Sequence, residues 1–201
     1  MREVHFNVRM RLRDVVYMAF VRLVLLYRRL RYRYEFRLIR MSQPRYAKVD
    51  PADYEQLRKY EWFVGKRRNG GSFYAGAYVT DSKTGKEKII FMHREIIEVH
   101  KKMVVDHINN DGMDNRRANL RRATHSQNMC NRKKRSGAHT SRHKGVYWDK
   151  EKRKWIAHIG FMGRNMHLGC FYSEIEAAKA RDRAAKKYHG EFAYLNFPEK
   201  K

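Results

Sequence analysis

The sequence predicts an α+β protein built from small β-rich modules, and three observations support this. Between residues 42 and 100, short runs rich in aromatic and β-branched side chains alternate with turn-forming Gly, Asn and Asp. After residue 143, three further short runs precede one helical segment at 173–189, whose alanine-rich face can pack closely on a sheet. The 201 residues are 42% hydrophobic, which is enough for two small cores.

The first forty residues do not share this pattern. They contain eleven arginines and three acids among Val, Leu, Phe and Tyr, and they have no Gly or Pro. The apolar run at 15–27 is broken by Arg22 and is too short to span a bilayer, and no small-residue cleavage site follows it. A basic helix on a membrane surface is one alternative. We expect instead that residues 1–40 are an accessory arm or that the functional start is Met41.

From residue 41 the expected elements follow in order. Helices are expected at 53–60 and 94–101, with strands at 61–66, 73–80 and 86–91 between them. Turns at Asn69-Gly70-Gly71 and from Asp81 to Gly85 would join these strands into a meander. A strand at 104–108 contains the pair Asp106-His107, a turn occupies 109–112, and Thr124 is the candidate N-cap of a helix at 124–132.

The segment after residue 143 predicts three strands and a helix. Turns are expected near 149–152 and at Met162-Gly163-Arg164. The helix at 173–189 opens with a candidate capping box, in which Ser173 and Glu176 bond reciprocally to the first turn. This pattern predicts an antiparallel three-stranded sheet packed on one helix.

The charge balance favours a polyanionic partner. Lys and Arg number 46 against 21 Asp and Glu, a formal net charge of +25, so nucleic acid is the first candidate. Basic residues lie on both sides of the helix at 124–132, where they can grip phosphates: Arg116, Arg117, Arg121, Arg122, Lys133, Lys134 and Arg135. A solvated charged face is the alternative reading of the run at 132–135.

Cysteine and histidine usage argues against two other classes of protein. Cys130 and Cys170 have no CxxC partner, so neither a zinc knot nor a disulfide framework is predicted, and a reducing compartment is the default. The stretch around His93 and His100 contains no HExxH, which leaves a zinc protease unsupported. We expect a structural role for His93.

The segment 105–132 can supply the chemistry of phosphodiester hydrolysis. That reaction needs a base to activate water, a cation to neutralise developing charge, and a group that holds the base in place. His107 is the candidate base, because imidazole is largely neutral at physiological pH. Asp106 points to the opposite side of the strand, and its carboxylate suits a hard divalent ion.

Eleven residues separate His107 from Asn119, and eight more separate Asn119 from Asn128. In this spacing the segment resembles the HNH endonuclease pattern of phage and homing enzymes, whose third position can be His or Asn. The resemblance implies a ββα-metal module within residues 41–131, with Asn128 joining Asp106 on one metal ion and Asn119 pinning the loop that carries His107. An amide ligand suits Mg²⁺ or Mn²⁺ rather than Zn²⁺. His125 shares a helical face with Asn128, and whether it also meets the ion stays open.

Residues 144–198 resemble the AP2 DNA-binding domain in the stretches KGVYW, KWIAHI, HLGCF, SEIEAAKARDRAA and YLNFP, and a basic linker at 132–143 precedes them. The resemblance implies that the exposed face of the sheet enters the major groove of double-stranded DNA. The side chains expected there are Lys144, Tyr147, Trp155, His158, Arg164 and His167. Tyr147 and Asp149 stand where plant members commonly carry arginine, so a GC-rich target is not transferred. Trp155 can equally belong to the core.

Two functions follow from these resemblances. We expect a metal-dependent DNA endonuclease of homing or mobile-element type, acting as a monomer in the cytoplasm of a bacterial or phage-infected cell, with no small-molecule cofactor and no membrane partner. The alternative is a noncatalytic DNA-binding regulator in which the AP2-like module works and the HNH region is a degenerate scaffold. An RNA-binding protein would explain the charge, but no RNP-type aromatic motif is present.

Overall fold

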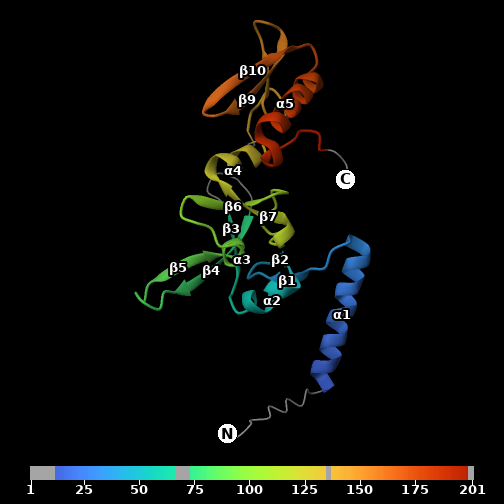
Figure 1. Cartoon of the computed structure of the whole chain (residues 1–201), viewed down its shortest axis with the longest axis vertical. Coiled ribbons are helices and arrows are strands. Elements are labelled where there is room, and N and C mark those ends of the chain that lie inside the picture. The colour runs from blue at the N-terminus through green and yellow to red at the C-terminus, as the bar shows by residue number, and fades with distance from the viewer. Residues whose placement is uncertain (1–11, 67–72, 135–136, 199–201) are drawn as a thin grey trace.

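The computed structural model describes residues 12–66, 73–134 and 137–198, and within them the chain is mixed α+β, as predicted. In chain order the elements are α1 (Leu12–Tyr32), β1 (Arg37–Arg40), β2 (Tyr46–Val49), α2 (Pro51–Leu57), β3 (Phe63–Lys66), β4 (Phe73–Thr80), β5 (Glu87–Phe91), α3 (Met92–Ile96), β6 (Met103–His107), the 3-10 turn η1 (Arg117–Asn119), β7 (Leu120–Thr124), α4 (His125–Asn131), β8 (Val146–Asp149), β9 (Lys154–Phe161), β10 (Arg164–Phe171), α5 (Glu174–His189) and η2 (Gly190–Phe192). The molecule is elongated, with β8–β10 and α5 at one end and α4 between them and the remaining strands (Figure 1).

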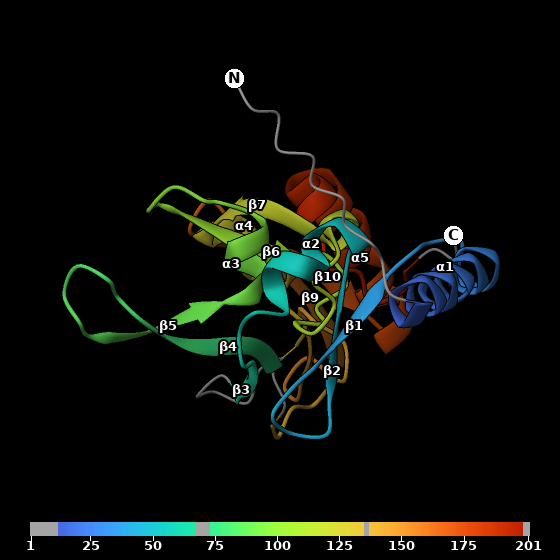
Figure 2. The ribbon, with the colours of Figure 1, turned by 90° about the horizontal axis from the view of Figure 1, so that it is seen from below.

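The end of the basic leader is part of the folded body. β1 pairs antiparallel with β2, so that Ile39 lies opposite Ala47. Ile39, Met41 and Ala47 are buried in the same core cluster. Before β1, α1 exposes many of its apolar side chains, and it lies on the opposite side of the molecule from the β4–β5 hairpin (Figure 2). No helix among the described residues has the length and apolar character needed to cross a membrane.

The central meander forms as expected, and a core of large side chains lies beneath it. β3, β4 and β5 form one antiparallel sheet. Leu57, Trp62 and Met92 are nearly inaccessible, and the indole Nε1 of Trp62 donates to the Leu57 carbonyl at 2.7 Å. The Asp81 carboxylate accepts the main-chain N–H groups of residues 83 and 84, which closes the predicted hairpin turn. The other predicted turn, Asn69-Gly70-Gly71, lies outside the described residues.

The segment that carries the candidate site contains a strand, β7, that the sequence did not predict. β6 pairs antiparallel with β7, placing Asp106 opposite Arg121 and His107 opposite Leu120. The run Leu-Arg-Arg-Ala-Thr is polar in composition, but Leu120 and Ala123 are both buried, on opposite faces of the strand. The predicted N-cap of α4 is confirmed: the Thr124 hydroxyl accepts the Gln127 N–H at 3.2 Å, and Gln127 Oε1 accepts the Thr124 N–H at 2.8 Å.

At the C-terminal end the three predicted strands form an antiparallel sheet in the order β10-β9-β8. Buried alanines of α5, including Ala177 and Ala178, pack against Val146 and Ala157 of this sheet. Gly145 has a φ of +75°, and a Cβ there would lie 2.5 Å from the His158 carbonyl oxygen, so only glycine fits. The predicted capping box at Ser173 is wrong, since its side chain makes no cap hydrogen bond.

Candidate active site and nucleic-acid interface

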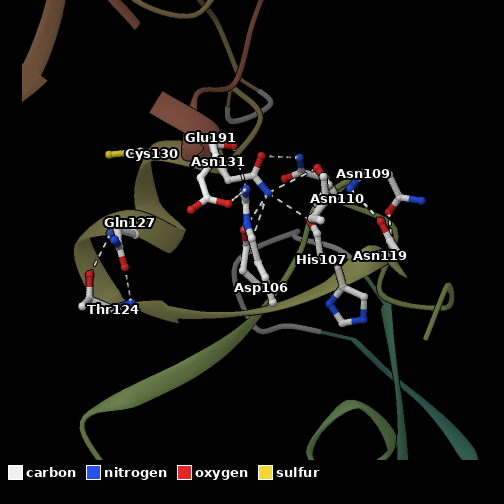
Figure 3. A network of polar contacts seen from close by, with 12 residues as sticks. Asp106, His107, Asn109, Asn110, Asn119, Thr124, Gln127, Cys130, Asn131 and Glu191 are labelled. Atoms are coloured by element: carbon white, nitrogen blue, oxygen red, sulfur yellow. Dashed lines mark hydrogen bonds and ion pairs between the residues drawn. The ribbon is translucent and has the colours of Figure 1, made fainter. Parts of the chain in front are cut away.

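Asp106 and His107 occupy the last two positions of β6, and both are buried, with 4% and 5% of their surface exposed. Successive side chains of a strand point to opposite faces. The Asp106 carboxylate points towards α4, where Asn131 binds it, and the imidazole of His107 points the other way (Figure 3). Each side chain of the pair has its own set of neighbours.

The imidazole of His107 is held by Asn115, a residue that the sequence did not single out. Nε2 of His107 lies 3.2 Å from Asn115 Oδ1, and Asn115 Nδ2 is turned towards the Gly112 carbonyl at 3.4 Å. An amide oxygen only accepts, so Nε2 carries the proton and Nδ1 is left as the basic nitrogen. Burial lowers the pKa of His107, and the Asn115 contact and nearby carboxylates offset this in part. The ring is therefore neutral at pH 7.

Two aromatic rings surround this base. The ring centroid of His93 lies 5.2 Å from that of His107 in an edge arrangement, and that of Tyr74 lies 5.6 Å away. Burial and the neighbouring His107 lower the pKa of His93 to about 3, and its Nδ1 is a buried atom without a hydrogen-bond partner among the described residues. A second neutral histidine thus lies beside His107.

The Asp106 carboxylate is held by two side chains. Asn131 Nδ2 lies 3.0 Å from each carboxylate oxygen and 2.9 Å from the His107 carbonyl. Arg121 approaches Oδ2 through Nε at 2.9 Å, and its Nη2 lies 2.8 Å away as an ion pair without hydrogen-bond geometry. Sequence reasoning missed Asn131, although it follows Asn128 by one helical turn and so shares its side of α4.

The Asp106 carboxylate is only partly free to bind a hard divalent ion, because Arg121 contacts its Oδ2. Among the described residues Oδ1 of Asp106 accepts one bond, from Asn131, and a carboxylate oxygen has two lone pairs, so one remains available. Asn128 is half-buried in α4, and within the described residues its side chain takes no hydrogen bond. No group of three or more His, Cys, Asp or Glu side chains in the described part of the chain could hold a metal ion. His125 is exposed at the first position of α4.

Asn119 ties the loop after His107 to the start of β7. Its Oδ1 accepts the Asn109 N–H at 3.0 Å, and its Nδ2 donates to Asn109 Oδ1 at 2.9 Å and to the Asp114 carbonyl at 2.7 Å. The loop also packs tightly on β4, because a Cβ on Gly112 would lie 2.1 Å from the Phe73 carbonyl oxygen. The loop that follows His107 is therefore held both by Asn119 and by its packing on β4.

The basic residues before α4 are placed in two ways. The Arg116 guanidinium donates two hydrogen bonds to the Asp114 carboxylate, from Nε and Nη2, each at 2.6 Å. The Arg117 guanidinium binds the Asp53 carboxylate in the same bidentate way, at 2.9 Å and 2.6 Å. Burial alone would raise the pKa of Asp114, but the Arg116 contact holds it below its usual value. Arg122 stays exposed, and its Nε donates to the Glu98 carbonyl at 2.9 Å.

The basic residues after α4 also differ in their surroundings. Lys133 is exposed, whereas Lys134 is half-buried and bonds main-chain carbonyls. Arg135 lies outside the described residues. Arg121 and Lys144 likewise make contacts within the protein, between β6–β7–α4 and the C-terminal module.

The C-terminal sheet presents one uncovered face. Val146 and Ala157 point towards α5, so Tyr147, His158 and His167 point to the other side. Tyr147 and His167 are exposed, His158 is half-buried, and Arg164 is exposed where β10 begins. Trp155 packs against the core cluster on the helix side, which supports the core alternative for this residue.

Comparison with known proteins finds matches to two segments of the chain. A family model described as HNH endonuclease matches residues 93–130. A stretch of 58 residues is 38% identical to the AP2-like ethylene-responsive transcription factor TOE2 of Arabidopsis thaliana and to the APETALA2-like protein 2 of Oryza sativa subsp. indica. These matches span 29% of this chain, but only 12% and 13% of the two plant proteins. The chain thus joins an HNH endonuclease segment to an AP2-like segment.

Proposed function

We propose that the protein is a metal-dependent DNA endonuclease of homing or mobile-element type, with His107 as general base. The observation that carries this proposal is the Asn115–His107 contact, which leaves a neutral imidazole with Nδ1 as its basic nitrogen. A base held by a second side chain is the arrangement that activates water in hydrolytic enzymes. Residues 93–130, which match the HNH endonuclease family, contain this pair.

In the reaction, water attacks the phosphorus of a DNA phosphodiester, the bond to the leaving oxygen breaks, and His107 Nδ1 takes the proton of the water. Asn115 keeps the tautomer that makes this transfer possible, and Asn119 keeps the loop closed behind the ring. Asp106 and Asn128 would hold one Mg²⁺ or Mn²⁺ ion. When bound, that ion neutralises charge that develops on the phosphate and the leaving oxygen.

DNA would bind through the uncovered face of the C-terminal sheet and through exposed basic residues beside the site. Tyr147, His167 and Arg164 are exposed on or next to that face, so we assign base contacts to them. Arg122 and Lys133 are exposed near α4, so we assign phosphate contacts to them. Such a protein would act in the cytoplasm of a bacterial or phage-infected cell.

Plasmid nicking with and without Mg²⁺ tests this function. The parent protein should convert supercoiled plasmid to the open circle only when Mg²⁺ or Mn²⁺ is present, and EDTA should stop the reaction. His107→Ala should lower the rate about a hundredfold or more with DNA affinity unchanged. His100→Ala is the matched control, because His100 is exposed outside the site and should behave as the parent.

The second candidate is a noncatalytic DNA-binding regulator. It is favoured by the Arg121 guanidinium, which already occupies one oxygen of the carboxylate that would bind the metal. A regulator would bind DNA with the same dependence on salt. It would show no metal-dependent nick at any salt concentration, and His107→Ala would match the parent.

A further inference from the structure

The connection between the nuclease region and the C-terminal module is made by several side-chain contacts. We call these contacts the joint. It consists of the bonds from Arg121, Lys134 and Lys144 to main-chain carbonyls and of the contact between Arg121 and the Phe192 ring. The sequence had assigned all three cations to DNA. In the structure each of them bonds main-chain carbonyls, and α4 lies between the two halves (Figure 1).

Arg121 connects the candidate site directly to the turn after α5. While Nε bonds Asp106 at 2.9 Å, Nη1 donates to the Glu191 carbonyl at 2.6 Å. The guanidinium carbon also lies 4.0 Å from the centre of the Phe192 ring, which is buried. A planar cation held at both ends and stacked on a ring has little freedom to move. The position of η2 is therefore coupled to that of Asp106.

Lys144 closes the C-terminal end of α4. Its Nζ donates to the carbonyls of Cys130 at 2.7 Å and Arg132 at 2.6 Å, as a cation at a helix C-terminus should. Its main chain is bound inside the C-terminal module, where its N–H donates to Asn196 Oδ1 at 2.7 Å. One residue thus belongs to the C-terminal module and caps a helix of the nuclease region.

Lys134 folds the connecting segment onto the C-terminal module. Its Nζ donates to the Ser141 carbonyl at 2.6 Å and to the His143 carbonyl at 2.8 Å. Ser141 and His143 are buried, and the Ser141 hydroxyl donates to Glu174 at the start of α5 at 2.6 Å. The segment is therefore bound to the module that follows it.

We propose that the joint holds the nuclease centre at one position relative to the C-terminal sheet, so that the cut falls at a fixed distance from the sequence that the sheet binds. This inference rests on the proposed function. A free linker of the length of residues 132–143 would have an end-to-end distance of about 20 Å. At about 3.4 Å per base pair, it would spread the cut over roughly six positions. The joint restricts the cut to one.

Mapping of the cut at single-nucleotide resolution tests the proposal. The substrate is an end-labelled duplex selected from a random pool by binding to the full chain. The parent should cut each nicked strand at one phosphodiester. The double variant Lys144→Met, Phe192→Ala removes two of the side chains that bridge the halves and should spread the product over about six positions. Lys179→Met loses the same charge from an exposed position of α5 outside the joint and should keep the single position. Equal patterns from the double variant and the parent would overturn the proposal.

A second variant keeps the test decisive if the double variant does not fold. Four residues, Gly-Ser-Gly-Ser, are inserted after Gly137, which is exposed. If the joint sets the geometry, the longer connection leaves the cut position unchanged, and a shifted or spread cut refutes the joint.

A distance measurement separates this inference from the proposed function. Spin labels are placed on Cys170 and on Lys101→Cys in a Cys130→Ser background, so that one label lies on each half. Double electron–electron resonance should give one narrow distribution of the distance between the two labels, both in the parent and in the insertion variant. A broad distribution in the parent refutes the joint even if the protein cuts DNA. A narrow distribution in a protein that never nicks plasmid refutes the nuclease and leaves the joint standing.

Discussion

Replacing Arg121 by Gln should strongly destabilise the protein even without DNA or metal. Asp106 is 4% exposed and the Arg121 side chain is 12% exposed, so the substitution leaves a buried carboxylate with Asn131 as its remaining side-chain partner. Removing one partner of a buried ion pair costs about 3–5 kcal/mol. Because Asn131 still donates to both oxygens, we expect the lower end of this range, about 3 kcal/mol.

Urea unfolding, followed by circular dichroism, gives the free energy of unfolding for the parent and for two variants. Arg122→Gln is the matched control, because the neighbouring Arg122 is exposed and its loss removes the same charge and one exposed contact. Its cost should stay below about 1 kcal/mol. A cost below about 1 kcal/mol for Arg121→Gln would show that water replaces the guanidinium at Asp106, and the argument for a buried pair would be wrong.

Three further predictions concern positions away from this pair. Ile39→Ala should lower the free energy of unfolding by about 2–4 kcal/mol, since Ile39 is buried; an unchanged urea midpoint would show that β1 is dispensable. The folded state keeps the pKa of His93 near 3, whereas in the unfolded chain the same side chain has its ordinary pKa of about 6.5. As the pH falls from about 6.5 towards 3, the unfolded chain binds this proton and the folded protein does not, so the free energy of unfolding decreases. His93→Phe should remove up to about 1.4 kcal/mol per pH unit from that slope, and an unchanged slope would refute the burial argument. Gly112→Ala should abolish nicking and lower the melting temperature, because its Cβ would lie 2.1 Å from the Phe73 carbonyl oxygen, whereas Gly160→Ala meets open space and should behave as the parent.

Patterns with a short period were readable from the sequence. The meander, the N-cap at Thr124 and the three C-terminal strands depend on alternation, turn residues and capping, all of which are local. The strand at 120–124 was not anticipated, because Arg121 and Arg122 make it look like a solvated run. Its β character comes from pairing with β6, which is tertiary context.

The partners of the site residues were less readable. Asn115 and Asn131 are buried and contact His107 and Asp106, yet each is one of several asparagines in a polar segment. The basic residues were read as a single class from net charge. Three-dimensional placement divides them into those bonded to carboxylates, such as Arg116, those in the joint, such as Lys144, and those left exposed, such as Lys133. Charge alone does not distinguish these environments.

Similarly, residues 37–40 looked like the end of a foreign leader because arginine dominates the first forty positions. Ile39 is nevertheless a core residue, and the Asp50 carboxylate that follows β2 accepts the main-chain N–H of Arg117 at 2.7 Å. The composition of this arginine-rich segment does not predict that one isoleucine is buried. Ile39 is buried because β1 pairs with β2.

The bond between Arg121 and the Glu191 carbonyl has a consequence for the order of events during synthesis. Its two residues are 70 positions apart in the chain, and contacts of such separation form late in folding. At ordinary translation rates, roughly 4–14 s pass between the emergence of the two residues from the ribosome. During that interval Asp106 and His107 exist in a nascent chain whose Arg121 has no second anchor. The full set of Arg121 contacts, and with it the surroundings of Asp106, is therefore complete only after the C-terminal sheet and α5 have been made.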